Sequence, residues 1–364
     1  MKILFAGGGT AGHITPAIAI AEELLKTDGN SVAFVLRKDG AENRLVKNKG
    51  YEFFGINAKG MERRITITNI LNILKNLLSV MTSLKIINSY KPDAVVGTGG
   101  YVCWPVLKAA RLSGVPTFIH ESNLYPGMST RNLAPSCKKV LLNYEGTKEH
   151  LKKTSNTVVV GNPIREEFEK TTRSVARRRL RIGENTILTV SFGGSGGAQR
   201  INDAIIGLMK KEKEAGEFLH VHASGEKYYQ NIKEELPELC RGGERCRIVP
   251  YLDDVPLLLS AADIIISRCG AMTLSEISAV GIPSILIPSP NVTDDHQKKN
   301  ADYLVKRGAA IMIEEKDLDT EALCSAWSSL SKSKRKRQAM GRCAKELFTR
   351  EAAKKIVEEI YKVL

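Results

Sequence analysis

The residues with the clearest chemical potential lie around a predicted helix start in the second half of the chain. The apolar run Asp263–Ser267 is typical of a strand buried on both faces of a parallel sheet. It leads through Gly270, which can take the positive φ of a sharp turn, into a helix that ends at Gly281. The N–H groups of Ala271 to Thr273 would then lie at the carboxyl end of the strand. Together with the helix dipole, these groups can hold a phosphate.

Side chains able to bind a sugar follow that helix start. Glu276 lies about one and a half turns into the helix, where its carboxylate can accept hydrogen bonds from a vicinal diol such as that of ribose. After the next predicted strand, Ser284–Pro288, an imidazole and an amide are brought to the same crevice by His296 and Gln297. The stretch therefore predicts a site for a phosphorylated sugar. An ordinary strand, turn and capped helix is the alternative.

A glycine turn near the N-terminus carries the first candidate base. The predicted strand Lys2–Ala6 runs into the turn Gly7–His13 and then into a helix predicted from Pro16 to Leu25. Such a turn would equally suit a dinucleotide-binding fold. What distinguishes this one is His13, because a nicotinamide-binding loop normally has no ionisable group at its tip. An imidazole titrates near neutral pH and can act as a general base.

Two further predicted strands end in polar side chains. One runs into a glycine turn that carries Tyr101, and the next is followed by His120 and Asn123. Because parallel α/β sheets bind ligands at the carboxyl ends of their strands, these residues should gather with His13 at one edge of a crevice. Either histidine could instead simply bond a neighbouring backbone group.

The same pattern begins again after a junction at Thr157–Arg165. Arg165 follows a proline that stiffens the exit, and it can reach the crevice as a cation on the donor side. A new predicted strand, Thr186–Ser191, enters a third glycine turn, Gly193–Arg200. Ser195 and the N–H groups of this turn suit the β-phosphate of a nucleotide sugar, whereas Arg200 is predicted to lie on the surface. The repetition predicts a second doubly wound α/β domain.

Length and charge agree with two domains and indicate an anionic partner. A chain of 364 residues and 40.0 kDa is long for a single core. Residues 1–160 hold 21 Lys and Arg against 11 Asp and Glu, so +10 of the formal charge of +14 lies in the first half. The chain has no recognisable nucleic-acid module and only 6% aromatic residues. We therefore expect an anionic lipid surface as partner and no nucleic acid.

The cysteines and the apolar runs predict a cytosolic chain without a membrane span. Seven cysteines with no paired Cys-x-x-Cys spacing indicate reduced thiols and make a zinc site unlikely to be built from them. The N-terminus is predicted to be a strand and not a signal peptide. No run of 18 apolar residues without charge is present.

The segment after Met61–Arg64 has two interpretations. Between residues 65 and 87 an apolar stripe at helical spacing predicts core packing, and it is formed by Ile70, Leu71, Leu74, Leu77, Leu78, Met81 and Leu84. Other apolar residues, Ile65, Ile67 and Ile73, lie outside this stripe, beside Arg63 and Arg64. Apolar side chains flanked by arginines are what a patch on a membrane surface needs.

Several of these motifs together resemble the MurG family of UDP-N-acetylglucosamine transferases, in glycosyltransferase family 28. They are Arg268-x-Gly-Ala-x-Thr-x-Ser-Glu276, Asp294-x-x-Gln297-x-x-Asn300-Ala301, the turn Gly7–His13, and His120-Glu-x-Asn123. The resemblance covers essentially the whole chain. The sequence departs from the family pattern at Ala11, where glycine is usual, at Ser122 and His296, where glutamine is common, and at Cys269, where serine is usual.

The resemblance implies a GT-B fold, with two Rossmann-like doubly wound parallel-sheet domains that face a central cleft. Residues 1–163 would form the acceptor and membrane-associating domain, joined by a last helix at about 341–364. Residues 164–340 would bind UDP-GlcNAc. The implied donor-binding residues are Thr10, Ala11, Gly12, Asn123, Arg165, Ser195, Leu252, Ala271, Met272, Thr273, Leu274, Ser275, Glu276, His296 and Gln297. Leu252 would bond the uracil through its backbone, beside Tyr251.

The implied reaction is the transfer of GlcNAc, with inversion, from UDP-GlcNAc to the 4-hydroxyl of MurNAc in lipid I. The product would be lipid II for peptidoglycan synthesis, on which cell shape and division depend. His13 is the expected base, with Tyr101, His120 and Asn123 around the acceptor, at the cytoplasmic face of the cell membrane. No metal or cofactor is expected, since helix capping accounts for Asp317-Leu-Asp319. A different lipid acceptor, a UDP-GlcNAc 2-epimerase and a membrane-docking subunit without activity remain as alternatives.

Overall fold

The chain divides into two compact units that are each built on a parallel sheet. The computed structural model describes residues 1–60, 67–194, 196–215, 218–241 and 245–364, with no side chains described for 67–71 and 212–215. Unit 1 comprises residues 1–164 and 349–364, and unit 2 comprises residues 165–348. Met61–Arg64, Ile65 and Ser195 therefore lie outside the described residues, and the side chains of Ile67, Ile70 and Leu71 do too.

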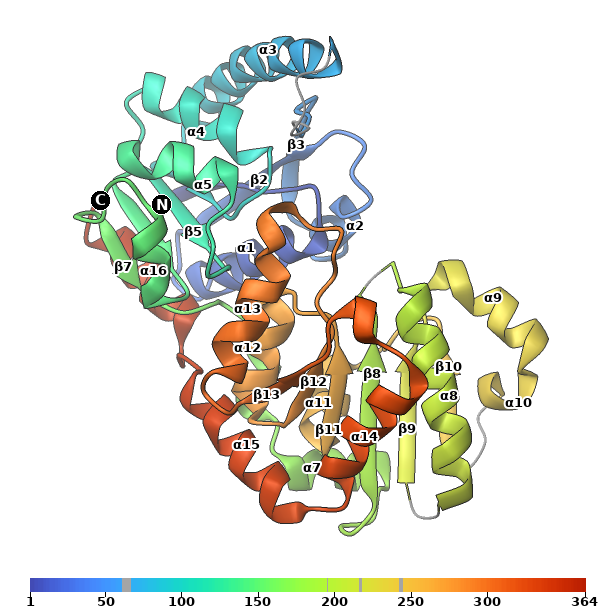
Figure 1. Ribbon diagram of the computed structural model, residues 1–364. Coiled ribbons are helices and arrows are strands. Elements are labelled where there is room, and N and C mark those ends of the chain that lie inside the picture. Colours follow the sequence, from blue (N-terminus) through green and yellow to red (C-terminus); the bar gives the residue numbers. More distant parts are fainter. Residues whose placement is uncertain (61–66, 195, 216–217, 242–244) are drawn as a thin grey trace. The chain divides into compact units, whose positions relative to one another are not determined.

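Unit 1 contains a seven-stranded parallel sheet in the order β3-β2-β1-β4-β5-β6-β7 (Figure 1). Its strands are β1 (Lys2–Ala6), β2 (Ser31–Arg37), β3 (Glu52–Ile56), β4 (Ala94–Gly97), β5 (Thr117–Glu121), β6 (Lys139–Leu142) and β7 (Thr157–Val159). The strand order reverses between β1 and β4, where β1 registers Phe5 against Val96. This reversal is the topological switch point, at which open α/β sheets bind their ligands.

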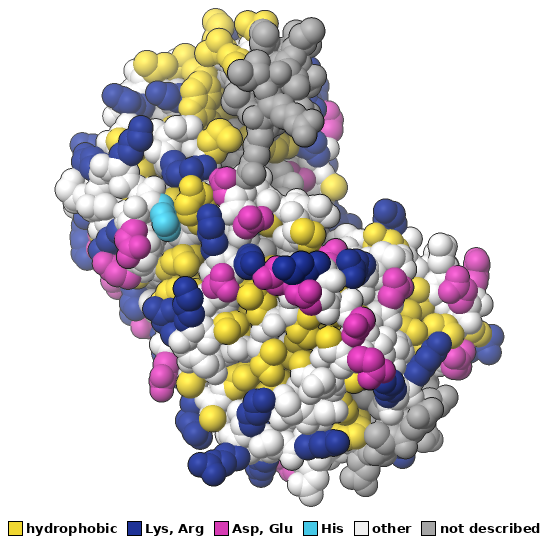
Figure 2. All heavy atoms as spheres, viewed as in Figure 1, with side chains coloured by type: hydrophobic (Ala, Val, Ile, Leu, Met, Phe, Trp, Pro, Cys, Tyr) yellow, Lys and Arg dark blue, Asp and Glu magenta, His cyan; other side chains and the backbone are white. Residues whose placement is uncertain are grey.

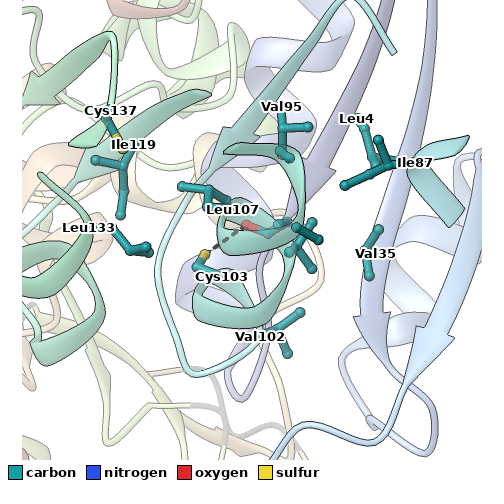
Figure 3. Close-up of a cluster of buried hydrophobic side chains, with 14 of the residues drawn as sticks. Leu4, Val35, Ile87, Val95, Val102, Cys103, Leu107, Ile119, Leu133 and Cys137 are labelled. Atoms are coloured by element: carbon teal, nitrogen blue, oxygen red, sulfur yellow. Dashed lines mark hydrogen bonds between the residues drawn. The ribbon is translucent and has the colours of Figure 1, made fainter. Parts of the chain in front are cut away.

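Helices cover both faces of this sheet. They are α1 (Ala11–Leu24), α2 (Asn43–Asn48), α3 (Ile67–Tyr90), α4 (Cys103–Leu112), α5 (Met128–Leu133) and α16 (Ala352–Tyr361), with short 3₁₀ turns at Ala134–Ser136 and Glu145–His150. Because side chains alternate along a strand, Ile3 and Phe5 of β1 pack under α1 and α16, whereas Leu4 packs under α3 and α4. The second of these cores surrounds Cys103 and Leu107 of α4 (Figure 3).

Helix α16 completes the first unit from the far end of the chain. Its side chains Ile356, Val357 and Ile360 are buried in the same core as Ile14 and Ile20 of α1. The sequence predicted this return at about residue 341, but the structure keeps residues 341–348 in unit 2. The reason is that α15 (Lys334–Glu346) packs on a helix of unit 2, where Gly341 lies against the backbone of Gly281.

Unit 2 contains a six-stranded parallel sheet in the order β10-β9-β8-β11-β12-β13. Its strands are β8 (Ile187–Phe192), β9 (Phe218–Ala223), β10 (Cys246–Val249), β11 (Ile264–Ser267), β12 (Ser284–Leu286) and β13 (Ala310–Met312). The helices, besides α15, are α6 (Glu167–Lys170), α7 (Arg173–Leu180), α8 (Gln199–Ala215), α9 (Glu226–Glu235), α10 (Pro237–Cys240), α11 (Val255–Ala261), α12 (Ala271–Val280), α13 (His296–Val305) and α14 (Thr320–Ser331), with 3₁₀ turns at Thr293–Asp295 and Glu315–Asp317. The switch point of this sheet lies between β8 and β11.

Most of the predicted apolar stripe of helix α3 does not face the core. The residues that pack inward include Asn76, Ser79 and Ser83, and the Asn76 side chain exchanges two hydrogen bonds of 2.9 and 3.0 Å with the backbone of Lys59. Four residues of the predicted core stripe face outward instead, since Leu74, Leu77, Leu78 and Met81 are 50–64% exposed. Ile73, predicted to lie outside the stripe, is 44% exposed as well, whereas Leu84 of the stripe packs against the core as predicted. The prediction that Leu74, Leu77, Leu78 and Met81 form core is therefore wrong. A helical stripe identifies a face, but not what covers it.

Three smaller expectations can be compared with the structure. All seven cysteines are free thiols, as predicted. Asp319 caps α14 by accepting a hydrogen bond of 2.8 Å from Ala322 N, which confirms the capping interpretation of Asp317-Leu-Asp319. None of the helices in the described part of the chain combines the length and hydropathy that a membrane-spanning segment needs.

Candidate active site

In unit 1, two glycine turns interlock at the switch point of the sheet. The turn after β1 carries His13, and the turn after β4 carries Gly99 and Tyr101. A Cβ on Gly99 would lie 2.5 Å from Nδ1 of His13, so only glycine lets the imidazole lie against this turn. Thr98 Oγ1 donates to the carbonyl of His13 at 2.7 Å. The two turns therefore hold His13 in place, partly exposed, at the carboxyl edge of the sheet.

The first glycine turn is also held from its other side. Gly9 adopts φ +92°, and a Cβ there would lie 2.9 Å from the Tyr101 ring. On the far side of the turn, the N–H of Gly9 donates to Oε1 of Glu42 at 2.7 Å. A bond to a carboxylate is a strong one, so Glu42 and Tyr101 together fix the conformation of the turn. Glu42 was not predicted as a site residue, because nothing in its local sequence links it to Gly9.

His120 is a buried structural residue and does not reach the edge of the site. Its side chain is 1% exposed, and its Nε2 donates to the carbonyl of Gly161 at 2.9 Å. Burial lowers the pKa of His120, so the imidazole is neutral, and the bond to Gly161 only partly opposes this shift. The prediction that His120 joins His13 at the crevice is therefore wrong, and the alternative that it bonds a backbone group is confirmed.

Asn123 is positioned by the carboxylate of Glu121. This buried carboxylate accepts hydrogen bonds from the N–H of Asn123 at 3.0 Å, from its side-chain amide at 3.0 Å and from the N–H of Gly127 at 2.9 Å. Asn123 remains partly exposed. Ser129, just beyond, donates to the carbonyl of Gly100 at 3.0 Å. The loop after β5 is thereby tied to the glycine turn after β4, and Asn123 is held near Tyr101 and His13 at the same sheet edge.

In unit 2, helix α12 begins directly at the carboxyl end of β11, as predicted. Gly270 is its N-cap, but with φ −64° and ψ 137°, so the predicted positive φ is wrong: the extended conformation alone turns the chain. Gly281 ends the helix in the left-handed conformation, with φ 76°, as predicted. Two of the implied donor contacts face inward, since Leu274 is fully buried and Ser275 Oγ donates to the carbonyl of Ala271 at 3.1 Å. Only their backbone atoms could contact a donor.

Glu276 and Arg165 form a pair on the outer side of α12. Arg165 Nη2 lies 3.7 Å from Glu276 Oε1, and the guanidinium also lies over the Phe168 ring, 5.1 Å from its centroid. Burial raises the pKa of Glu276 to about 7, although Arg165 favours the charged form and lowers it. Burial deprives this carboxylate of hydrating water, so a ligand whose hydroxyl groups donate hydrogen bonds to it would stabilise its charged form.

The predicted segment Asp294–Ala301 organises the adjacent loops through its amides. Gln297 Oε1 accepts from Ser289 N at 2.9 Å and from Cys269 N at 3.3 Å, while Asn300 Nδ2 donates to the carbonyl of Cys269 at 3.4 Å. The two amides thus hold the backbone at the exit of β11. His296 Nδ1 bonds the carbonyl of Thr293 at 2.8 Å.

The turn before His296 is strained. Asp294 and Asp295 both adopt the left-handed conformation, with φ 57° and 49°. Non-glycine residues rarely do so, and two in succession are found where the surrounding structure imposes the conformation, often at functional sites. The strained turn sets the direction in which α13 starts, and with it the placement of His296 and Gln297.

The remaining predicted residues are more exposed than core residues would be. Tyr251 is 40% exposed and Leu252 is partly exposed, beyond the edge strand β10. Arg200 is exposed on α8, as predicted. Among the described residues there are no groups of three His, Cys, Asp or Glu that could hold a metal ion.

Comparison with known proteins identifies the family. The model of the glycosyltransferase family 28 N-terminal domain matches residues 3–142, and that of its C-terminal domain matches residues 188–356. The UDP-N-acetylglucosamine--N-acetylmuramyl-(pentapeptide) pyrophosphoryl-undecaprenol N-acetylglucosamine transferase of Thermoanaerobacter sp. (strain X514) is 42% identical over 326 residues, which is 89% of each chain. The chain belongs to the MurG family of glycosyltransferase family 28. It is therefore a glycosyltransferase.

Solved structures agree with this fold. The crystal structure of Acinetobacter baumannii MurG superposes with a TM-score of 0.78 at 26% identity, covering 99% of both chains. The UDP-GlcNAc 2-epimerase from Neisseria meningitidis, bound to UDP-GlcNAc, superposes with a TM-score of 0.68 over the full length of both chains, but at 16% identity. That likeness shows the fold alone. The predicted GT-B class, with two parallel-sheet units, is confirmed.

Family membership clarifies the departures from the MurG pattern. Ala11 is the first residue of α1 and is not among the residues with positive φ, so its methyl group fits the helical backbone. That helix starts five residues before the predicted Pro16, which lies inside it. Cys269 is fully buried, and burial raises its pKa, so its thiol is neutral behind the loop. The family motifs also contain two residues whose roles the sequence analysis missed, Glu121 and Asn300.

Proposed function

We propose that this MurG-family chain transfers GlcNAc from UDP-GlcNAc to the MurNAc 4-hydroxyl of lipid I, giving lipid II. The observation that carries the proposal is the pair formed by Arg165 and Glu276, the latter in α12, a helix that starts at the switch point of unit 2. A sugar nucleotide is the ligand class that needs a helix N-terminus for phosphate and a carboxylate for ribose within one site. The activity printed for the Thermoanaerobacter relative supports the same donor and acceptor.

The donor is proposed to bind unit 2. The start of α12 and the glycine turn after β8 would receive the diphosphate, and Glu276 would accept from the ribose hydroxyls. Leu252 would bond the uracil through its backbone. As the bond to GlcNAc breaks, negative charge develops on the β-phosphate of UDP. Backbone N–H groups and the helix dipole directed at that charge lower the barrier, with one such donor contributing roughly 3 kcal/mol.

The acceptor is proposed to bind unit 1, at the interlocked turns. His13 would take the proton from the MurNAc 4-hydroxyl as the oxygen attacks the anomeric carbon, so that the configuration inverts. The fixed position of His13 against Gly99 supports this role, because a base must be held within hydrogen-bond reach of the reacting hydroxyl. Asn123 and Tyr101 would orient the acceptor. His120 would act only indirectly, by holding Gly161.

A lipid-linked acceptor is supported by the outward face of α3. Five large apolar side chains are exposed there, and the hydrophobic surface they form is visible at the upper end of the molecule in Figure 2. Lys75 and Lys85 are exposed on the same helix. An apolar stripe with cations suits insertion into an anionic membrane surface. We propose that the chain binds peripherally to the cytoplasmic face of the membrane through this helix.

The decisive test is product formation. Purified protein is incubated with labelled UDP-GlcNAc and a lipid I analogue in anionic vesicles, with and without EDTA. We expect a disaccharide on the lipid, formed at the same rate with EDTA, because none of the proposed steps uses a metal. Transfer to diacylglycerol instead, or formation of UDP-ManNAc without any acceptor, would replace the proposal by a different lipid transferase or by an epimerase.

A further inference from the structure

A chain of buried polar side chains crosses the centre of unit 2. Ser191 on β8 lies 2.8 Å from Nε2 of His220 and 2.8 Å from Nδ1 of His222, both on β9. His222 Nε2 lies 3.0 Å from Oδ1 of Asn202, in the first turns of α8. All four side chains are at most 1% exposed. None of them was singled out by the sequence, and none has a part in the proposed contacts with the donor.

The direction of each hydrogen bond in this chain can be deduced. The side-chain amide of Asn202 donates through Nδ2 to the carbonyl of Ser224 at 3.1 Å, so its Oδ1 faces His222 and can only accept. His222 must therefore donate from Nε2. Burial and the neighbouring His220 keep this imidazole neutral, since they lower the pKa of His222 to about 3. Its Nδ1 then accepts from the hydroxyl of Ser191, and Ser191 in turn accepts from Nε2–H of His220.

The Asn202 end of this hydrogen-bond network lies next to the third glycine turn. Gly197 adopts φ +70°, and a Cβ on it would lie 2.0 Å from the carbonyl oxygen of Ser224, the atom to which Asn202 donates. Gly225 is equally close, since its Cβ would lie 2.6 Å from Gly197 N. The described end of the turn, at Gly196 and Gly197, therefore lies against Ser224 and Gly225. Asn202 holds the carbonyl of Ser224, whose N–H is held by Val249, and His222 holds Asn202 in turn.

We propose that His222 and Asn202 are positioning residues for the donor diphosphate, which hold Gly196 and Gly197 of the third glycine turn in their binding conformation. This inference rests on the proposed function, in which that turn receives the β-phosphate. Burying four polar groups costs free energy unless every one is paired, and a fully paired network fixes one conformation where an apolar core would allow several. A turn made largely of glycine has few side chains of its own that could fix its conformation.

A second buried hydrogen bond in the same unit provides a matched control. Trp327 Nε1 on α14 donates to Oγ1 of Thr189 on β8 at 2.9 Å, two residues from Ser191. Thr189 is fully buried and Trp327 is 5% exposed. This bond stabilises the sheet but does not connect to the glycine turn. Trp327→Phe thus removes a buried hydrogen bond of unit 2 in which none of the four network side chains takes part.

Two substitutions at His222 separate positioning from packing. In His222→Gln the side-chain amide can place its N–H where Nε2 lies and keep the bond to Asn202. In His222→Asn the shorter side chain reaches Ser191 but not Asn202. Each variant is compared with the wild type and with Trp327→Phe. The measurements are the thermal unfolding midpoint, the Kd of UDP-GlcNAc by calorimetry, and the KM values for donor and acceptor.

We expect His222→Asn to weaken UDP-GlcNAc binding and raise the donor KM about tenfold, the equivalent of one lost buried hydrogen bond, with the acceptor KM unchanged. His222→Gln should restore most of the donor affinity. Trp327→Phe should lower the unfolding midpoint and leave the donor Kd unchanged. Equal donor Kd values for His222→Asn and the wild type would overturn the inference, as would equal losses of affinity in His222→Asn and Trp327→Phe.

If His222→Asn does not fold, Ser191→Ala replaces it, since it removes one hydroxyl and leaves no cavity. It should weaken donor binding about threefold through the unanchored His222 ring; an unchanged Kd would again overturn the inference. Calorimetry needs no acceptor and no turnover. A wild type that fails to bind UDP-GlcNAc would therefore contradict the proposed function, whereas a wild type that binds it together with an unaffected variant contradicts this inference alone.

Discussion

At the scale of single residues, His13 is the group whose loss should affect chemistry more than binding. We expect His13→Ala to lower kcat by roughly 100-fold or more, the usual contribution of a general base. The Kd of UDP should change far less than kcat, because His13 belongs to unit 1 and the residues proposed to hold the diphosphate and the ribose belong to unit 2. Steady-state kinetics with a lipid I analogue, combined with UDP titration, check this prediction. A kcat within a factor of three of the wild type would assign the base to another residue.

Glu276 should make donor binding depend on pH. Its pKa of about 7 means that the carboxylate is ionised above that pH and protonated below it, and only the ionised form accepts from both ribose hydroxyls. The affinity for UDP-GlcNAc should therefore fall as the pH is lowered from 8 to 6, by about fivefold overall.

Glu276→Gln provides the control, because its amide does not titrate. Its affinity should be lower than that of the wild type at pH 8 and nearly constant down to pH 6. Calorimetry at several pH values measures how the affinity for UDP-GlcNAc changes with pH in the wild type and in Glu276→Gln. UDP-GlcNAc is preferable to UDP as the probe because its diphosphate is a diester and has no ionisation in this range. If the affinity depended on pH equally in both proteins, the group whose titration affects donor binding would not be Glu276.

The roles of single residues were partly accessible to the sequence. The positions of His13 and Glu276 follow from local rules, since a glycine turn after a strand and a helix start after another strand place them at sheet edges. The burial of His120 and the bond between Glu42 and Gly9 depend on which distant backbone atoms come close, and no local pattern encodes that. Gly270 shows the same limit, because glycine permits a positive φ but does not require it.

At the scale of elements, α3 should determine membrane binding. Replacing Leu77 and Leu78, which are 50% and 64% exposed, by aspartate places two charges in the outward apolar face. We expect a loss of binding to anionic vesicles of at least tenfold, because apolar area is removed and the added carboxylates are repelled by the anionic surface. Sedimentation with vesicles measures the effect.

The matched control is Val175→Asp on α7 of unit 2, where a single apolar side chain is 44% exposed. It should leave vesicle binding unchanged. The α3 variant should still glycosylate an acceptor with a short, water-soluble lipid at the rate of the wild type. If vesicle binding survives in the α3 variant, another surface must face the membrane.

Helices and strands were predicted well where their own composition determines whether they are buried or exposed. The predicted strands β1, β8 and β11 are apolar runs with mostly buried residues, which is typical of the interior of a parallel sheet. The edge strand β3, which is only partly buried, was not predicted. Helix α3 was predicted less well, because both of its faces carry apolar side chains: Ile87 packs into the core beside Ser79 and Ser83, while a larger apolar stripe faces outward. The alternative interpretation, a membrane patch drawn from Ile65, Ile67 and Ile73 beside Arg63 and Arg64, stays a prediction.

At the scale of the whole molecule, we expect α16, the segment with which the chain returns to unit 1, to be needed for the stability of unit 1 and not for that of unit 2. Ending the chain at Phe348 removes α16 and uncovers the core beneath Ile356, Val357 and Ile360. Each fully buried side chain of this kind contributes about 1.5–3 kcal/mol, so unit 1 should lose most of its stability. Unit 2 should keep its fold and its stabilisation by UDP.

Limited proteolysis in the presence and absence of UDP distinguishes the two units. In the truncated chain, fragments from residues 1–164 should be digested first, while 165–348 remains protected by UDP. A control truncation after Tyr361 removes only three residues that follow the helix and should behave like the full chain. Loss of UDP protection in the chain ending at Phe348 would mean that unit 2 depends on α16 as well.

The distribution of buried thiols makes it possible to follow the unfolding of each unit. Cys103 and Cys137 are buried in unit 1, and Cys240, Cys246 and Cys269 are buried in unit 2. A sulfhydryl-specific alkylating reagent can reach such groups only when the surrounding structure opens. Mass spectrometry of the labelled peptides would thus time the opening of each half separately, so the native chain already carries its own built-in reporters and needs no engineered probe.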